Sequence, residues 1–370
     1  MGGALGKEII LRRSRGMKVL ATAAVAIVAL GVSACGKGAD TGGGTTTNGS
    51  SGPSKKNVKV GLAFDIGGRG DKSFNDSAAA GLDKVKSDLN IETKELAAVV
   101  GESENDKYSR LKLLCDAGYN PIIAVGFVYD GADSKTGPLA RAAKDCPNTK
   151  FAIVDGATQA DNVADLGFAE NEGSFLVGVA AALKTKTGTV GFIGGCQVDL
   201  IKKFEAGFTA GVKAAKPDAK VLPNYLSTPA DACKGFNDPP NGKKQANGLY
   251  DQGADIIYAA AGGSGTGVFE AAKEKSKLAI GVDSDQYQTV SDASLKPVIM
   301  TSMLKRVDTA VFNFVKDFGE NKFKAGFTVF DLKSDGVGYA TSGGQVDDIK
   351  SKLDDFKQQI ISGKITVPSK

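Results

Sequence analysis

The sequence predicts an α/β protein with two similar lobes, and three observations lead to this prediction. Short apolar runs that suit buried strands alternate with segments that suit helices, which is typical of parallel sheets with crossover helices. The alternation restarts at Thr189 with a similar rhythm. The chain has 370 residues and 42% hydrophobic content, whereas single cores stop growing near ~250 to 300 residues.

The first lobe is expected over residues 58–168. Its strands are apolar runs, and its helices are Ala-rich or amphipathic segments between them. The predicted strands are 58–64, 91–100, 121–125, 151–154 and 163–168, the last of which we expect to cross toward the second lobe; the predicted helices are 77–89, 106–117 and 137–145.

The second lobe is expected over residues 169–300, and residues 301–370 are expected to supply crossover and closing elements shared between the lobes. The segment 171–183 has an acidic start and a Gly- and Ala-rich apolar body, which suits a tightly packed helix. The other predicted helices are 200–215, 243–252, 265–275, 307–318 and 346–361; the predicted strands are 190–193, 221–226, 256–260, 278–282, 298–303 and 327–332.

Residues 1–34 have the features of an export signal. Basic residues up to Lys18 precede an apolar run, 19–32, which is shorter than the ~20 apolar residues of a membrane span. Met1 and Met17 are alternative starts. The sequence Val-Ser-Ala-Cys at 32–35 resembles a bacterial lipobox, so we expect lipidation of Cys35 and an anchor on the extracytoplasmic face of the cell membrane; an ordinary secretory signal with a chance cysteine is the alternative.

Residues 35–57 combine this cysteine with a Gly-, Thr- and Ser-rich stretch that cannot bury enough apolar surface to fold, so it is predicted to be a flexible tether. Four cysteines remain, and an even count in an exported protein favours disulfides. Pairing Cys115 with Cys146 and Cys196 with Cys233 keeps each bridge inside one lobe. Four free thiols are the alternative.

Several classes of chemistry are disfavoured. The chain has no His, the commonest general base and a usual ligand of catalytic zinc. Its Gly-rich stretches, 67–73 and 261–267, do not fit nucleotide-binding fingerprints, and 283–288 lacks the Gly of a calcium loop. The net charge of +4 lies partly in the leader and indicates no nucleic-acid-binding face. We therefore expect neither enzyme activity, nor a cofactor, nor a metal.

Acidic and aromatic residues recur just after the predicted strands. The carboxyl ends of parallel strands meet at one edge of a sheet, so these residues are expected to gather at the cleft between the lobes. They are Asp65, Phe74, Tyr129, Asp130, Asp155, Phe236, Asp238, Gly262, Gly263, Asp283, Asp285 and Lys305. Flat apolar faces, several carboxylates and one cation suit a neutral polyhydroxylated ligand with an aromatic part.

Five stretches resemble the basic membrane protein family of bacterial lipoproteins, of the purine nucleoside receptor type. They are 71–75 (Asp-Lys-Ser-Phe-Asn), 236–239 (Phe-Asn-Asp-Pro), 261–263 (Ala-Gly-Gly), 280–286 (Ile-Gly-Val-Asp-Ser-Asp-Gln) and 301–306 (Thr-Ser-Met-Leu-Lys-Arg). The resemblance covers the body from Val58 onward. It implies a type I periplasmic-binding-protein fold with two Rossmann-like lobes, and the substrate-binding component of an ABC transporter for nucleosides.

The resemblance also implies roles for individual residues. Phe74 and Phe236 would enclose the base, and Asp283 would hold the ribose hydroxyls. Lys305 and the Gly262 amide would hold the sugar end, Asp65 and Asn75 would serve the first-lobe side, and Asp155, in preference to Asp130, would face the base edge. The four lobe cysteines and the Pro-Pro pair at 239–240 depart from the family pattern, which makes a purine less certain than a nucleoside.

The expected partners are a nucleoside and an ABC permease, with membrane attachment through the lipid, no nucleic acid, and a monomeric protein. A receptor of the same fold for a sugar or another small polar ligand is the main alternative. An extracytoplasmic hydrolase is disfavoured by the missing His, and a surface antigen without a small ligand is a further alternative.

Overall fold

The structure is a computed structural model that describes residues 58–99 and 101–370. The predicted signal peptide, the lipidated Cys35 and the tether lie outside the described residues. Within the described ranges, none of the helices combines the length and the apolar character that a membrane crossing requires.

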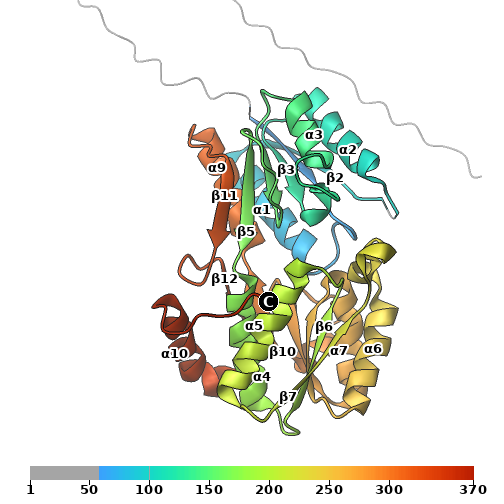
Figure 1. The fold of residues 1–370 in the computed structure, drawn as a ribbon, viewed down its shortest axis with the longest axis vertical. Coiled ribbons are helices and arrows are strands. Elements are labelled where there is room, and N and C mark those ends of the chain that lie inside the picture. Colours follow the sequence, from blue (N-terminus) through green and yellow to red (C-terminus); the bar gives the residue numbers. More distant parts are fainter. Residues whose placement is uncertain (1–57, 100) are drawn as a thin grey trace, which may run out of the picture. The chain divides into compact units, whose positions relative to one another are not determined.

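The first lobe is built on a parallel sheet with the strand order β11-β5-β4-β3-β1-β2 (Figure 1). Its strands are β1 (Lys59–Ala63), β2 (Glu92–Leu96), β3 (Ile122–Val125), β4 (Phe151–Val154), β5 (Val163–Phe168) and β11 (Gly326–Phe330). The chain order reverses beside β1, because β2 lies on one side of it and β3 on the other. In open α/β sheets such a switch point is where ligands bind, and the loop after β1 starts there.

The second lobe repeats this plan with the strand order β12-β10-β9-β8-β6-β7. Its strands are β6 (Thr189–Gly194), β7 (Lys220–Tyr225), β8 (Ile256–Ala260), β9 (Leu278–Asp283), β10 (Ile299–Lys305) and β12 (Val337–Tyr339). All of these pairings are parallel except that of β12, which runs antiparallel to β10.

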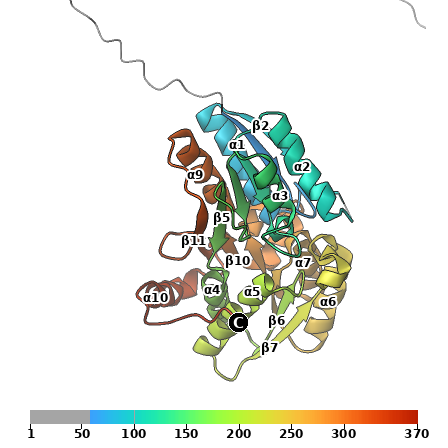
Figure 2. The same ribbon diagram turned by 45° about the horizontal axis from the view of Figure 1, so that its top comes forward.

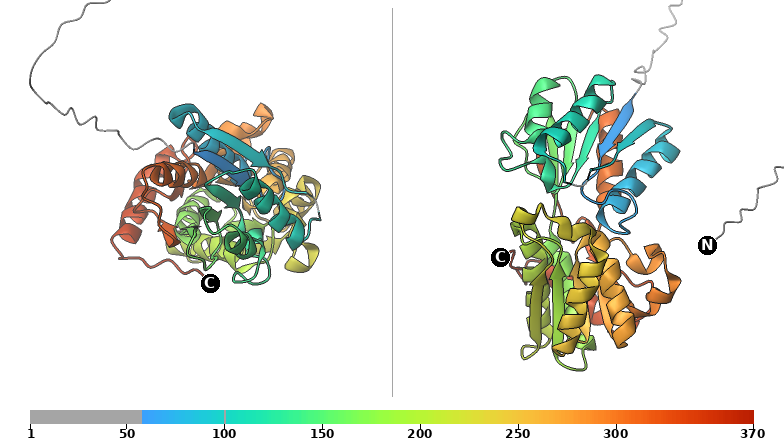
Figure 3. Two further views of the ribbon diagram at one scale, coloured as in Figure 1. Left: turned by 90° about the horizontal axis from the view of Figure 1, so that it is seen from above. Right: turned by 90° about the vertical axis from the view of Figure 1, so that its right-hand side faces the viewer.

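Helices cover both faces of each sheet (Figure 3). In the first lobe, α1 packs with α9 and α2 packs with α3; in the second lobe, α4 packs with α5 and α6 packs with α7. The helices are α1 (Phe74–Leu89), α2 (Glu104–Asp116), α3 (Pro138–Asp145), α4 (Glu170–Lys184), α5 (Asp199–Ala215), α6 (Pro239–Asp251), α7 (Gly265–Lys275), α8 (Gln286–Thr289), α9 (Val307–Gly319) and α10 (Lys350–Ile361).

One apolar core is shared by the two lobes. It holds Leu62 and Val154 from the first sheet, Phe192 and Val282 from the second, and helix residues such as Leu176. Alternate residues of the same strands face smaller cores under α2 and α3 in the first lobe and under α6 and α7 in the second. Strands buried on both faces explain why the predicted strands are continuous apolar runs.

The described chain passes between the two sheets three times, at the β5–α4, β10–α9 and β11–β12 connections. Figure 2 shows the result: α9 lies against first-lobe α1, whereas α10 lies against second-lobe α4. Two sequence expectations differ from this arrangement. The strand 163–168 stays in the first sheet, and the crossing follows it at Ala169; the short strand β12 was not predicted, because three residues carry too little periodicity.

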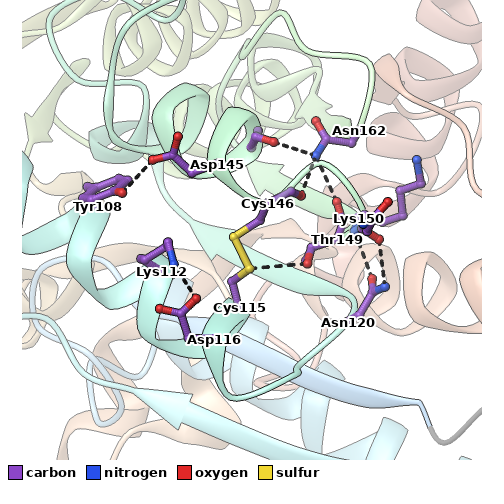
Figure 4. Close-up of a disulfide and its surroundings, with 12 residues drawn as sticks. Tyr108, Lys112, Cys115, Asp116, Asn120, Asp145, Cys146, Thr149, Lys150 and Asn162 are labelled. Atoms are coloured by element: carbon purple, nitrogen blue, oxygen red, sulfur yellow. Dashed lines mark hydrogen bonds and ion pairs between the residues drawn. A yellow bond between two sulfur atoms is a disulfide. The ribbon is translucent and has the colours of Figure 1, made fainter.

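Two disulfides join the four lobe cysteines. Cys115 is bonded to Cys146 and Cys196 to Cys233, and each bridge lies within one lobe. Figure 4 shows the first bridge, where Cys115 of α2 meets Cys146 at the end of α3, beside Thr149 and Asn162.

Candidate ligand-binding site

All eight residues that the sequence predicts to bind ligand line one cavity at the carboxyl ends of the strands. The cavity spans about 560 Å³ of space between its lining atoms, part of which is open to solvent. Asp65, Phe74, Asn75 and Asp155 come from the first lobe, and Phe236, Gly262, Asp283 and Lys305 from β10 and the second lobe. Asp130 does not line it; its carboxylate accepts hydrogen bonds from the Ala157 amide and the Thr158 hydroxyl.

The loop after β1 is organised by Asp71. Its carboxylate accepts hydrogen bonds from the backbone amides of Ser73, Asn75 and Asp76 at 2.9, 2.8 and 3.0 Å. These donors lie at the start of α1, where amides lack partners within the helix, so Asp71 caps that helix. As a result α1 begins at Phe74, and the Phe74 side chain lines the cavity.

Asp65 is held by the same loop. Its Oδ1 accepts the Ile66 amide at 2.5 Å, and its own amide donates to Asn75 Oδ1 at 3.2 Å. Asn75 Nδ2 donates to Ile66 O and to Asp71, so Asn75 braces Asp65. Gly126 lies against this carboxylate with φ at +100°, and a Cβ there would lie 2.0 Å from Oδ2. Burial raises the pKa of Asp65 to about 7.

Lys305 is the buried cation of the site, with 1% of its side chain exposed. Its ammonium pairs with Asp155 of the first lobe, and it lies 3.3 Å from Oε1 of Glu170, the first residue of α4. The rings of Phe74, Phe168 and Phe204 surround it, with centroids 5.1, 5.1 and 5.5 Å from Nζ. Burial alone would lower the pKa of Lys305, but the carboxylates of Asp155, Glu170 and Asp283 outweigh it and raise that pKa.

Asp155 and Asp283 occupy equivalent positions in the two lobes, at the ends of β4 and β9. Both have left-handed backbones, with φ at +65° and +63°. Such strain in a non-glycine residue persists where the surroundings enforce it, and it is common at ligand sites. Asp155 Oδ1 is buried and accepts no hydrogen bond within 58–99 and 101–370, so a ligand donor would complete it.

The two lobes also contact each other directly beside the cavity. Ser73 Oγ donates to Asp283 Oδ2 at 2.7 Å, and Ser284 Oγ donates to Ser73 O at 3.0 Å. Lys72 O accepts from Gln286 Nε2 and Thr289 Oγ1 at 3.1 and 3.2 Å. Lys72 is itself in the left-handed region, with φ at +57°. The first-lobe loop therefore bonds directly to the second lobe.

Sequence reasoning missed several side chains of the site, among them Phe127, Phe204 and Glu170. Phe127 follows β3 and meets Phe236 edge to face, with centroids 6.3 Å apart and planes at 63°. Phe204 lines the cavity from α5. Glu170 lies behind Lys305 and does not line the cavity. Phe127 follows a predicted strand just as Asp65 does, so the same rule could have found it; Phe204 and Glu170 look like ordinary helix residues.

The raised pKa of Asp65 predicts a stability change with pH. A carboxyl with a folded pKa of about 7 and an unfolded value near 3.8 binds an extra proton when folded, so the stability it contributes is lost as pH rises through this window. Asp65→Asn removes this dependence and keeps an acceptor for the Ile66 amide. In urea denaturation without ligand, we expect the stability of the variant relative to the wild type to increase by about 2 to 4 kcal/mol between pH 5 and pH 8.

Asp88 provides the matched control, because its carboxylate is exposed and pairs with Lys84. Asp88→Asn should change stability by the same amount at pH 5 and pH 8. A stability difference between wild type and Asp65→Asn that does not vary with pH would contradict the prediction.

Comparison with known proteins decides the family. Residues 58–370 match the family described as "ABC transporter substrate-binding protein PnrA-like". The chain belongs to this family. It is 35% identical to the "ABC transporter nucleoside-binding protein BmpA" of Lactococcus lactis, over 95% of this chain and 99% of that protein. It is 37% identical to a "CD4+ T-cell-stimulating antigen" of Listeria monocytogenes, over 86% of this chain and 90% of that one.

A solved structure of a solute-binding protein with a similar sequence has the same architecture. An ABC transporter solute-binding protein from Aeropyrum pernix superposes with a TM-score of 0.71 at 28% identity, covering 85% of this chain and 94% of the other. This confirms the expected periplasmic-binding-protein fold. The PnrA-like chain is thus an extracytoplasmic substrate-binding protein of an ABC transporter and not an enzyme.

Proposed function

We propose that the chain is a lipid-anchored receptor that captures a nucleoside, preferably a purine, in its cleft and delivers it to an ABC permease. The observation that carries the proposal is the composition of the cavity. Phe74 from one lobe and Phe236 from the other both line it, together with four carboxylates and one ammonium that is already paired. Such a wall offers ring faces to a base and acceptors to hydroxyl and amino groups, and it disfavours an anionic ligand.

The roles of single residues are part of this proposal. Phe74 and Phe236 enclose the base, Asp65 and Asp155 accept from its edge, and Asn75 holds Asp65 in place. Asp283 accepts from the ribose hydroxyls, and Lys305 with the Gly262 amide holds the sugar end. Asp155 Oδ1, which has no hydrogen-bond partner among the described residues, supports a donor on the ligand at that point. The relative from L. lactis that is named for nucleoside binding supports the ligand class.

Delivery rests on closure of the lobes around the ligand. The three connections between the sheets are the positions where backbone angles can change, with 58–168 and 169–300 as the moving lobes and 301–370 shared between them. A monomer attached through Cys35 by a flexible tether would keep the cleft within reach of a permease.

Calorimetry with adenosine, guanosine, inosine and uridine tests the proposal. At least one nucleoside should bind with micromolar or tighter affinity, which corresponds to about 8 kcal/mol, and purine nucleosides should bind more tightly than uridine. Free ribose is the control, since ribose binding as tight as nucleoside binding would indicate a sugar receptor. Absence of binding to all four nucleosides by the folded protein would overturn the proposed function.

A further inference from the structure

We propose that the Cys196–Cys233 disulfide positions the Phe236 ring for ligand, so that affinity depends on the redox state of this one bridge. The inference rests on the proposed function in that Phe236 is taken to contact the ligand. Cys196 follows Gly195 at the exit of β6, and Cys233 lies three residues before Phe236. The bridge therefore ties the segment 227–238, between β7 and α6, to the end of β6, the strand next to edge strand β7 in the second sheet.

The segment has little apolar burial of its own to hold it there. Residues 228–232 are exposed, and of the next three residues only Cys233 and Gly235 are buried. Glycine has no side chain to pack, so Cys233 is the buried side chain in 228–235. Exposed loops with few buried apolar groups open locally at a small free-energy difference. A covalent bond at Cys233 restricts that opening.

The backbone at the bridge is strained as well. Ala232 and Cys233 are consecutive non-glycine residues in the left-handed region, with φ at +52° and +51°. Each such residue is unfavourable by roughly 1 to 2 kcal/mol, and the conformation leads directly into the short 3-10 turn Lys234–Asn237 that carries Phe236. Without the bridge, the free backbone would relax toward commoner angles and carry Phe236 with it.

The ring position tolerates little displacement. The Phe236 ring rests on the backbone of Gly195, where a Cβ would lie 2.3 Å from ring atom Cδ1. Phe127 of the first lobe also meets this ring edge to face. A ring that left Gly195 would move into the cavity or away from Phe127, and either movement removes the face that a base would stack on.

Hydrogen bonds hold the same segment at its second half. Ser227 Oγ donates to Gly195 O at 2.7 Å and accepts the Gly235 amide at 3.0 Å, while Ser264 Oγ donates to Gly235 O at 2.7 Å. These bonds fix Gly235. The side-chain bonds of the residues before it stay within the segment, where the Asp231 carboxylate accepts from the Thr228 amide and hydroxyl, so Cys233 is the side chain that ties 228–234 to the end of β6. The disulfide therefore holds the residue just before the turn 234–237, and the serine hydrogen bonds hold Gly235 within that turn.

The first-lobe bridge is a natural control. Cys115–Cys146 joins α2 to the end of α3, next to the core under those helices, and neither cysteine lines the cavity (Figure 4). The two bridges close loops of similar length, with sequence separations of 31 and 37 residues. Loop-closure entropy depends weakly on length, so removing either one should change global stability by a similar amount.

The experiment compares Cys196→Ala/Cys233→Ala with Cys115→Ala/Cys146→Ala in the full chain. Amide hydrogen exchange of 228–237 is measured without ligand, and dissociation constants are measured for the four nucleosides. The second-lobe variant should exchange these amides at least about tenfold faster and bind at least about tenfold more weakly, because affinity falls with the fraction of competent protein. The first-lobe variant should keep both values within about twofold of the wild type.

The readouts separate failure of this inference from failure of the proposed function. If the wild type binds a nucleoside and the second-lobe variant shows the same exchange and affinity, the inference is overturned while the function stands. If the wild type binds none, unchanged exchange of 228–237 in the variant still overturns the inference, and accelerated exchange confined to that segment supports it. Should the variant not fold, reduction of the folded Cys115→Ala/Cys146→Ala variant with a phosphine breaks the Cys196–Cys233 bridge alone and supplies the same comparison.

Discussion

Replacing Lys305 with methionine is expected to lower the free energy of unfolding by about 3 to 5 kcal/mol at pH 7.5. The substitution leaves the buried Asp155 carboxylate without the cation that pairs with it, and it leaves the buried Glu170 carboxylate with the partly exposed Lys203. Glu170 and Asp283 already have pKa values raised by burial, and both lose the opposing effect of the Lys305 charge. They take up protons as pH falls, so the deficit should be smaller at pH 5.5 than at pH 7.5. Urea denaturation at the two pH values measures it.

Lys203 is the matched control for this substitution. It also pairs with Glu170, at 3.7 Å, but 37% of its side chain is exposed. Exposed pairs contribute about 0 to 1 kcal/mol, so Lys203→Met should change stability by no more than that. The prediction would be contradicted if Lys305→Met lowered the free energy of unfolding no more than Lys203→Met does at both pH values. In that case the buried charges of Lys305, Asp155 and Glu170 would not stabilise the fold as described.

Replacing Phe74 with alanine is expected to weaken nucleoside binding by about 1 to 3 kcal/mol, which is roughly fivefold to more than a hundredfold in the dissociation constant. Phe74 presents its ring to the cavity from the start of α1, where Asp71 fixes the helix. Alanine removes the stacking face and also one of the three rings around the Lys305 ammonium. Calorimetry with the tightest-binding nucleoside measures the effect.

Two variants distinguish stacking from general loss of apolar surface. Phe74→Leu keeps much of the apolar area and removes the flat ring, so it should recover only part of the affinity. Phe327→Ala removes a ring from the exposed strand β11, where 59% of the residue is accessible, and it should leave the dissociation constant unchanged. Full affinity in Phe74→Ala would contradict the stacking role.

The cleft residues could be predicted from the sequence because a local rule places them. Strands buried on both faces are continuous apolar runs, and the residues after each strand lie at the carboxyl edge of the sheet. Asp65 and Asp155 come directly after such runs, and Asp283 and Lys305 end them, so the topology brings them together whatever the details of packing.

The partners of Lys305 could not be predicted in the same way. Glu170 is an acidic residue in the first turn of a helix, where the helix dipole alone would explain it. Phe204 is one apolar residue on an amphipathic helix, and the rotation of α5 against the sheet decides whether it reaches the cavity. The place of β12 beside β10 depends on a crossing between lobes, for which a three-residue strand provides no signal.

Under the proposed closure mechanism, the direct bonds between the loop at Lys72 and Ser73 and the second lobe would act on ligand affinity through the population of the closed form. They lower the free energy of that form whether or not the cleft is occupied, and the measured affinity scales with the closed fraction of the empty protein. In the proposed delivery to a permease, Ser284 and Thr289, which do not line the cavity, would help to set the balance between retention of the ligand and its release. Evolution can adjust that balance at these positions without altering which ligand is recognised.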